Sequence, residues 1–322
     1  MHQSDAKPGW LDRISPAWFL FLIAPVTAEF LSGSTLVLNP FLDLIDWVLY
    51  GCGTILIREL RVRWRKGWVA VFLMSIAYTI IEEGFMLNTL FDPGANTAGR
   101  YAGVNWVWTA GMLMVHSLLS IFLPILLAET VFHKRAEQSW ISTRAGFGHL
   151  ALFCANAIFV GTAIPKSPRP GALAWVLQSL VVLASLAAAR FVPYRRTDSP
   201  CPGAHSVRWC FWRVFLGIFL TLLVGFLAPA LNLPAAVSIT FMWGVYGVFL
   251  WFLQRLGAFH PDFPPDRRLA VASGIIYFWI VVSPATLLAK HNPFPLMFAV
   301  MMVLLLRRVG QRLAALGSPL PV

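Results

Sequence analysis

The stretch that decides the fold runs over residues 105–131 and reads NWVWTAGMLMVHSLLSIFLPILLAETV. It is apolar almost throughout, and its two ionisable side chains are His116, near the middle, and Glu129, close to the end. A helix needs about 20 such residues to cross the ~30 Å hydrocarbon core of a membrane. The stretch therefore predicts a membrane-spanning helix with an ionisable group at mid-membrane depth.

Similar apolar stretches recur along the whole chain, near residues 17–37, 40–57, 67–90, 105–131, 147–165, 171–192, 209–230, 235–254, 269–289 and 292–307. Hydrophobic residues make up 58% of the chain and charged residues only 12%, about half the charge content of a soluble domain. This composition excludes a conventional cytosolic enzyme, a secreted disulfide scaffold and a disordered chain. We expect an all-α, polytopic integral membrane bundle of about ten transmembrane helices. Eight is the alternative, and the stretches 147–165 and 292–307 are the weakest.

Basic residues indicate how the bundle is oriented. With the N-terminus in the cytoplasm, 21 of the 25 Lys and Arg residues fall on the cytoplasmic side, and four fall outside: Arg100, Lys166, Arg169 and Lys290. This split follows the positive-inside rule and predicts that both termini are cytoplasmic, in a prokaryotic plasma membrane. The net charge of +11 then marks a membrane face, so we expect no nucleic-acid partner. The expected partners are the bilayer and anionic lipid heads at basic cytoplasmic loops, including the run 58–66, taken as solvated. The oligomeric state stays open.

Acidic residues divide the chain into two unequal halves. Predicted spans five to ten contain no carboxylate, whereas the first four contain Glu29, Asp43, Asp46, Glu82, Glu83 and Glu129. An ionisable group at mid-membrane costs about 2.5–3.5 kcal/mol, so several together imply a partner or a function. We therefore predict a cytoplasmic segment (1–16), a polar four-helix functional half (17–131), a cytoplasmic loop (132–146), an apolar six-helix scaffold (147–307) and a cytoplasmic tail (308–322).

Depth along the predicted helices gathers most of these groups in the outer half of the membrane: Glu29, Asp43, Asp46, Glu82, Glu83 and His116. We expect one site there, within reach of Arg100 on the following outer loop. Asp43 and Asp46 have a second interpretation, as caps at the start of a helix that follows Pro40. Consecutive helical residues point about 100° apart, so at most one of Glu82 and Glu83 should face the bundle axis.

The glutamate pair Glu82-Glu83 and the pattern Met112-x-x-x-His116 resemble the CPBP/CAAX-protease-like family of intramembrane glutamate proteases. Leu87 stands at that family's arginine position, Asn88 follows it, and the chain has no His-x-x-x-Asn pattern. The resemblance implies a hydrolase in which a buried glutamate acts as general base on water and a histidine donates to the developing oxyanion.

These residues define the candidate site and its alternatives. The catalytic candidates are Glu82, Glu83 and His116, with a supporting polar cluster of Glu29, Asp43, Asp46 and Asn88. A proton- or cation-coupled transporter would use the same groups. A non-catalytic membrane subunit would use them only to fix helix packing. The cofactor is unknown; no metal is expected, and a divalent ion on Glu29, Glu83 and His116 is the weaker alternative.

Overall fold

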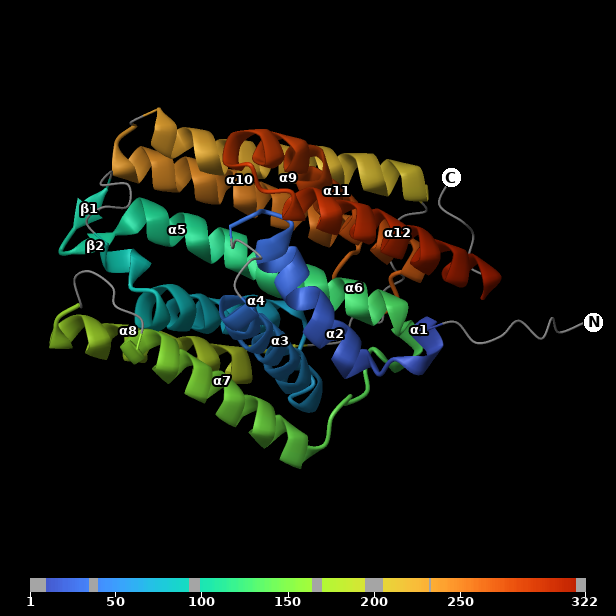
Figure 1. The fold of residues 1–322 in the computed structure, drawn as a ribbon, viewed down its shortest axis with the longest axis horizontal. Coiled ribbons are helices and arrows are strands. Elements are labelled where there is room, and N and C mark those ends of the chain that lie inside the picture. The colour runs from blue at the N-terminus through green and yellow to red at the C-terminus, as the bar shows by residue number, and fades with distance from the viewer. Residues whose placement is uncertain are drawn as a thin grey trace, which may run out of the picture.

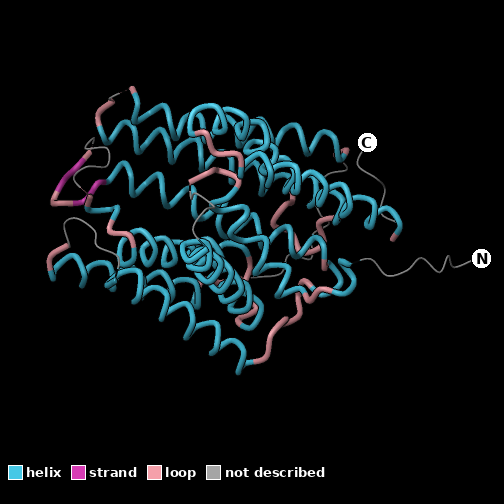
Figure 2. The backbone as a smooth tube through the Cα atoms, viewed as in Figure 1, coloured by secondary structure: helices cyan, strands magenta, loops and turns pink. Residues whose placement is uncertain are grey.

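The computed structural model describes residues 10–34, 40–92, 99–163, 170–194, 205–231 and 233–316. It is helical apart from one antiparallel hairpin, in which β1 (Arg100–Tyr101) pairs with β2 (Val104–Asn105) (Figure 2). The described part therefore confirms an all-α fold.

The helices before residue 140 include three π-helical segments (η1, η2, η4) and two short 3₁₀ segments (η3, η5). In chain order they are α1 (Trp10–Arg13), α2 (Pro16–Pro25), η1 (Val26–Phe30), α3 (Pro40–Arg63), α4 (Trp68–Thr79), η2 (Ile80–Met86), η3 (Thr89–Phe91), α5 (Trp106–Val115), η4 (His116–Phe122), α6 (Leu123–Val131) and η5 (His133–Arg135). Six long helices follow: α7 (Thr143–Ala163), α8 (Ala172–Phe191), α9 (Val207–Ala230), α10 (Ala235–Leu256), α11 (Pro265–Lys290) and α12 (Phe294–Ala315).

Eight helices in the described residues are long and apolar enough to cross a membrane. They include α7 and α12. The helix α7 has the lowest mean hydropathy of the eight, as expected for the stretch 147–165, whereas α12 has 22 residues, so the expectation that the stretch 292–307 is short is wrong. The first predicted span is instead the short one, because α2 and η1 together cover only Pro16–Phe30. The second corresponds to α3, whose 24 residues carry charged groups near both ends. The protein is thus a polytopic helical membrane protein.

The polar helices lie in the middle of the molecule. In Figure 1, α4, α5 and α6 run between α7 and α8 on one side and the four helices α9–α12 on the other. Direct packing of α4 on α8, α3 on α7, α5 on α10 and α6 on α11 accounts for this arrangement. In the continuous helix Trp106–Val131, 83% of the most apolar 18-residue stretch is buried, whereas only 11% of the corresponding stretch of α7 is buried. The functional half and the scaffold stay predictions, but the structure encloses α4–α6 between the later helices.

The two ends of the bundle differ. The β1–β2 hairpin lies at one end, whereas α1 and the C-terminal end of α12 lie at the other (Figure 1). Asn105, the last hairpin residue, caps α5, and its side chain accepts a hydrogen bond from the Trp108 backbone N–H at 3.3 Å. At about 1.5 Å per residue, His116 then lies about 15 Å from the hairpin end. This places His116 near the middle of its helix.

Candidate functional site

All four acid–base groups in the centre of the bundle sit on π-helical segments. Glu29 lies in η1, Glu82 and Glu83 lie in η2, and His116 begins η4. Pro25 directly precedes η1, and a proline near the start of α6 closely follows η4. Proline has no N–H and crowds the carbonyl four residues earlier, which disturbs regular α-helical bonding nearby. Segments of π-helix occur frequently at functional sites, and here three of them meet.

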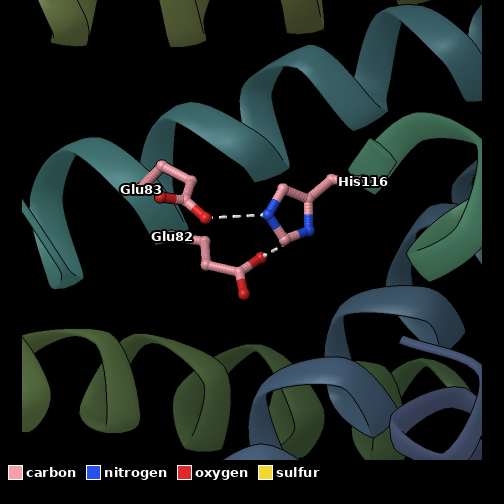
Figure 3. A group of neighbouring side chains, drawn as sticks. All are labelled: Glu82, Glu83 and His116. Atoms are coloured by element: carbon pink, nitrogen blue, oxygen red, sulfur yellow. Dashed lines mark hydrogen bonds and ion pairs between the residues drawn. The ribbon is translucent and has the colours of Figure 1, made fainter. Parts of the chain in front are cut away.

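His116 lies between two carboxylates, as Figure 3 shows. Its Nε2 is 2.9 Å from Oε1 of Glu83, and its Nδ1 is 3.3 Å from Oε2 of Glu82. The Nδ1 atom also hydrogen-bonds Oγ of Ser120, at 3.0 Å. His116, Glu82 and Glu83 are 4%, 2% and 5% exposed. Because the Ser120 hydroxyl can accept from Nδ1 or donate to it, the contacts fit both an imidazolium and a neutral imidazole with its proton on Nε2.

Both glutamates reach His116 on a neighbouring helix, whereas at most one was expected to face the bundle axis squarely; which of them faces the axis stays a prediction. The π-helix has more residues per turn than an α-helix, because its hydrogen bonds run from residue i to i+5. Consecutive side chains on η2 therefore point in more similar directions. Glu82 and Glu83 consequently flank one imidazole ring (Figure 3).

The chain reversal after η2 anchors Glu83. Asn88 adopts a left-handed backbone conformation, with φ of +56°, and is buried. Asparagine tolerates this conformation better than most residues. The reversal brings the Thr89 hydroxyl onto Oε2 of Glu83, to which it donates a hydrogen bond. Asn88 thus supports the cluster through the backbone, and Thr89 is a site residue that the sequence reasoning missed.

A tyrosine extends the cluster to Glu29. The Tyr50 hydroxyl lies 2.6 Å from Oε1 of Glu29 and also contacts Oε1 of Glu82. A phenol has one proton to donate, so both contacts are hydrogen bonds only when one of the two carboxyl groups is itself protonated. Tyr78 lies beside Glu82, but its buried hydroxyl makes no hydrogen bond of normal geometry within the described residues. Tyr50 and Tyr78 complete the ring of groups around Glu82.

The other expected groups lie at the periphery of this cluster or away from it. Asp43 lies in the first turn of α3, seven residues before Tyr50, and no hydrogen bond or ion pair is found between it and the cluster in the described ranges. Asp46 interacts electrostatically with Tyr78. Arg100 is exposed and donates to the backbone carbonyl of Phe91 at 2.9 Å, so the expectation that it reaches the acids is wrong. The capping interpretation of Asp43 and Asp46 stays a prediction, because the residue that precedes α3 lies outside the described part.

A second polar cluster lies at the opposite end of α3. Arg58 is fully buried, with Nη1 2.7 Å from Oε1 of Glu59 and Nε 3.2 Å from Oε1 of Glu129. Arg61 lies 2.6 Å from the same oxygen of Glu129. Arg58 also donates to the backbone carbonyl of Ala136 at 2.5 Å. The expectation of a solvated run from residue 58 is therefore wrong for Arg58, Glu59 and Arg61. Lipid-head contacts of the remaining basic loop residues stay a prediction.

The central cluster has the composition of a metal site. Glu82, Glu83 and His116 each offer a ligand atom, and these atoms lie within 4.8 Å of one another. The metal ligands considered from the sequence were Glu29, Glu83 and His116, so the structure replaces Glu29 by Glu82 in this set. Two carboxylates and one imidazole suit a hard divalent ion such as Mn²⁺ better than structural zinc. The contacts of both ring nitrogens with carboxylates explain the cluster equally well without an ion.

Comparison with known proteins supports the membrane location and adds no activity. A family model described as "Uncharacterized membrane protein family" matches residues 18–317. No curated protein and no solved structure matches the chain. The chain therefore belongs to this membrane protein family.

Proposed function

We propose that this member of the family is a membrane-embedded hydrolase that cleaves peptide bonds with Glu82, Glu83 and His116. One observation carries the proposal: a single buried imidazole has a carboxylate at each ring nitrogen, in the middle of a membrane bundle. Such groups supply the base and the proton donor that hydrolysis needs. The substrate class rests on the resemblance of these three residues to intramembrane glutamate proteases.

The contacts favour different roles for the two glutamates. Glu83 accepts from Thr89 and contacts His116 Nε2, so both of its oxygens are engaged and it orients the ring. Oε2 of Glu82 faces His116 at 3.3 Å and has no hydrogen bond of normal geometry in the described residues. We therefore assign Glu82 as the general base. It takes a proton from water, and the hydroxide attacks the peptide carbonyl. His116 donates a hydrogen bond to the oxyanion of the tetrahedral intermediate and keeps its proton. The intermediate then re-forms the C=O bond and breaks the C–N bond, as the proton on Glu82 passes to the leaving amine.

A proton-coupled transporter is the second candidate, favoured by one specific feature. Glu29, Tyr50, Glu82, His116 and Glu83 form an uninterrupted series of contacts that joins η1, α3, η2 and η4. Carboxylates and histidines linked in this way relay protons in membrane pumps and carriers.

One experiment separates the candidates. Wild type, Glu82→Gln and the exposed control Glu137→Gln are reconstituted in the same vesicles, with a quenched fluorescent transmembrane peptide and a pH-sensitive dye inside. The hydrolase proposal predicts that Glu82→Gln lowers cleavage about 10²-fold or more, and that proton flux is equal in all three. Unchanged cleavage in Glu82→Gln refutes the proposal. Flux that is lost only in Glu82→Gln identifies a transporter, and neither activity in wild type identifies a structural subunit.

A further inference from the structure

A cavity of about 540 Å³ opens at the hairpin end of the bundle, beside the central cluster but separate from it. Its walls come from the hairpin, η2, η3, α5 and α8, and include Ile80, Arg100, Thr109, Leu173, Leu177 and Gln178. The volume is within the ~300–1,000 Å³ typical of small-ligand pockets. The hairpin and one end of α8 lie at the same end of the bundle in Figure 1. The cavity is therefore formed by parts of the chain that are distant in sequence.

The walls of the cavity are mostly apolar, and the wall formed by α8 lies at the exposed surface of the bundle. Leu173 and Leu177 of α8 are 71% and 53% exposed, although both line the cavity. In the most apolar window of α8, only 17% of residues are buried, so this helix presents most of its surface to lipid. An apolar chain can thus enter the cavity from the bilayer without crossing a polar barrier.

One charged group, Arg100, gives the cavity a polar edge. Arg100 lines it and donates from Nη2 to the Phe91 carbonyl, a bond that uses one of the five N–H groups of a guanidinium. Gln178 also lines the cavity, but its amide is buried against Gly84 and is not open to the cavity. A cation at the edge of an apolar cavity suits a ligand with an anionic head and an apolar chain.

We propose that this cavity binds one anionic phospholipid, with its phosphate at Arg100 and an acyl chain along Leu173 and Leu177 of α8. Charge complementarity selects the anionic head, and the lipid-facing walls select the chain. The site does not depend on the proposed hydrolase activity. One cation near a membrane surface contributes enough to favour an anionic over a zwitterionic lipid about fivefold.

Native mass spectrometry of the full chain, released from detergent with phosphatidylglycerol or phosphatidylcholine of equal chain length, tests the proposal. We expect wild type to bind one phosphatidylglycerol about fivefold more tightly than phosphatidylcholine. Arg100→Gln should abolish this preference and leave phosphatidylcholine binding unchanged. Ala174→Phe fills the cavity and should weaken both lipids. Ala184→Phe, on an exposed face of the same helix outside the cavity, should weaken neither.

Loss of any of these differences would overturn the lipid site. A wild type without lipid preference, an Arg100→Gln variant that keeps the preference, or an Ala174→Phe variant that binds normally each contradicts it. A second copy of the chain that occupies this face and is not displaced by lipid also contradicts it. Circular dichroism and the lipid-free unfolding midpoint establish that each variant is folded before binding is compared.

Discussion

Replacing Glu129 by glutamine should destabilise the bundle much more than the same replacement at Glu137. Glu129 is 2% exposed and its Oε1 lies 3.2 Å from Arg58 and 2.6 Å from Arg61. Removing one partner of a buried ion pair costs about 3–5 kcal/mol. The glutamine carbonyl still accepts a hydrogen bond, and Arg58 keeps Glu59, so we expect the lower end, about 3 kcal/mol. This corresponds to roughly a hundredfold larger unfolding constant.

Glu137→Gln is the matched control, because Glu137 pairs with the same arginine, Arg61. It lies 3.5 Å from Arg61 and its side chain is 61% exposed. An exposed pair contributes about 0–1 kcal/mol. Unfolding is measured by titrating sodium dodecyl sulfate into dodecyl maltoside micelles and recording tryptophan fluorescence and helicity. Equal midpoints for the two variants, or a Glu129→Gln midpoint equal to wild type, would show that the buried network does not hold the helices together.

Three further substitutions test the central cluster and the wall beside it. Tyr50→Phe should lower the free energy of unfolding by about 1.5–3 kcal/mol, because the Tyr50 hydroxyl forms hydrogen bonds with acidic groups. Tyr78→Phe should change the free energy of unfolding by less than about 1 kcal/mol. Equal effects of the two substitutions in the same titration would contradict the contacts described. Gly84→Ala should cost less than about 1 kcal/mol, because the atom that an added Cβ would meet, at 2.0 Å, is Oε1 at the end of the flexible Gln178 side chain, which can shift. A loss of about 2 kcal/mol or more in the same titration would contradict this. Asn88→Ala should lower the free energy of unfolding by about 1–2 kcal/mol and should lower peptide cleavage, because alanine disfavours the left-handed conformation. Asn88→Gly should keep the left-handed turn and most of the cleavage activity. If the glycine variant is as impaired as the alanine variant, the Asn88 side chain itself has a direct role.

The depth of the ionisable side chains in the membrane was predictable from the sequence. The direction in which each side chain points from its helix was not. The lengths of the apolar stretches place Glu82, Glu83 and His116 at similar depth, and the structure brings these three together. Asp43 was expected at similar depth too, yet it stays outside the cluster. The π-helical segments decide which side chains converge, and their extra residue per turn leaves no clear mark in local propensity. The catalytic role of the three residues remains a prediction.

The burial of Arg58, Glu59 and Arg61 was not predicted, for a related reason. The closely spaced arginines that begin at Arg58 are typical of a solvated membrane face. The adjacent Glu59 accounts for one contact of Arg58, but the carboxylate that Arg58 and Arg61 share, Glu129, is 71 residues away from Arg58. Only the packing of α3 beside α6 brings the two together. Similarly, Thr89 becomes a hydrogen-bond partner of Glu83 only through the positive φ of Asn88.

The buried charges have a consequence for how the chain is made. The contacts described for the two clusters join residues between Glu29 and Glu137, all of which precede α7. Chains are synthesised from the N-terminus and generally fold in that order. The acids and arginines of the early helices therefore have their partners as soon as these helices are inserted. The later helices, whose predicted membrane spans contain no carboxylate, can then assemble around a centre whose charged groups are already paired.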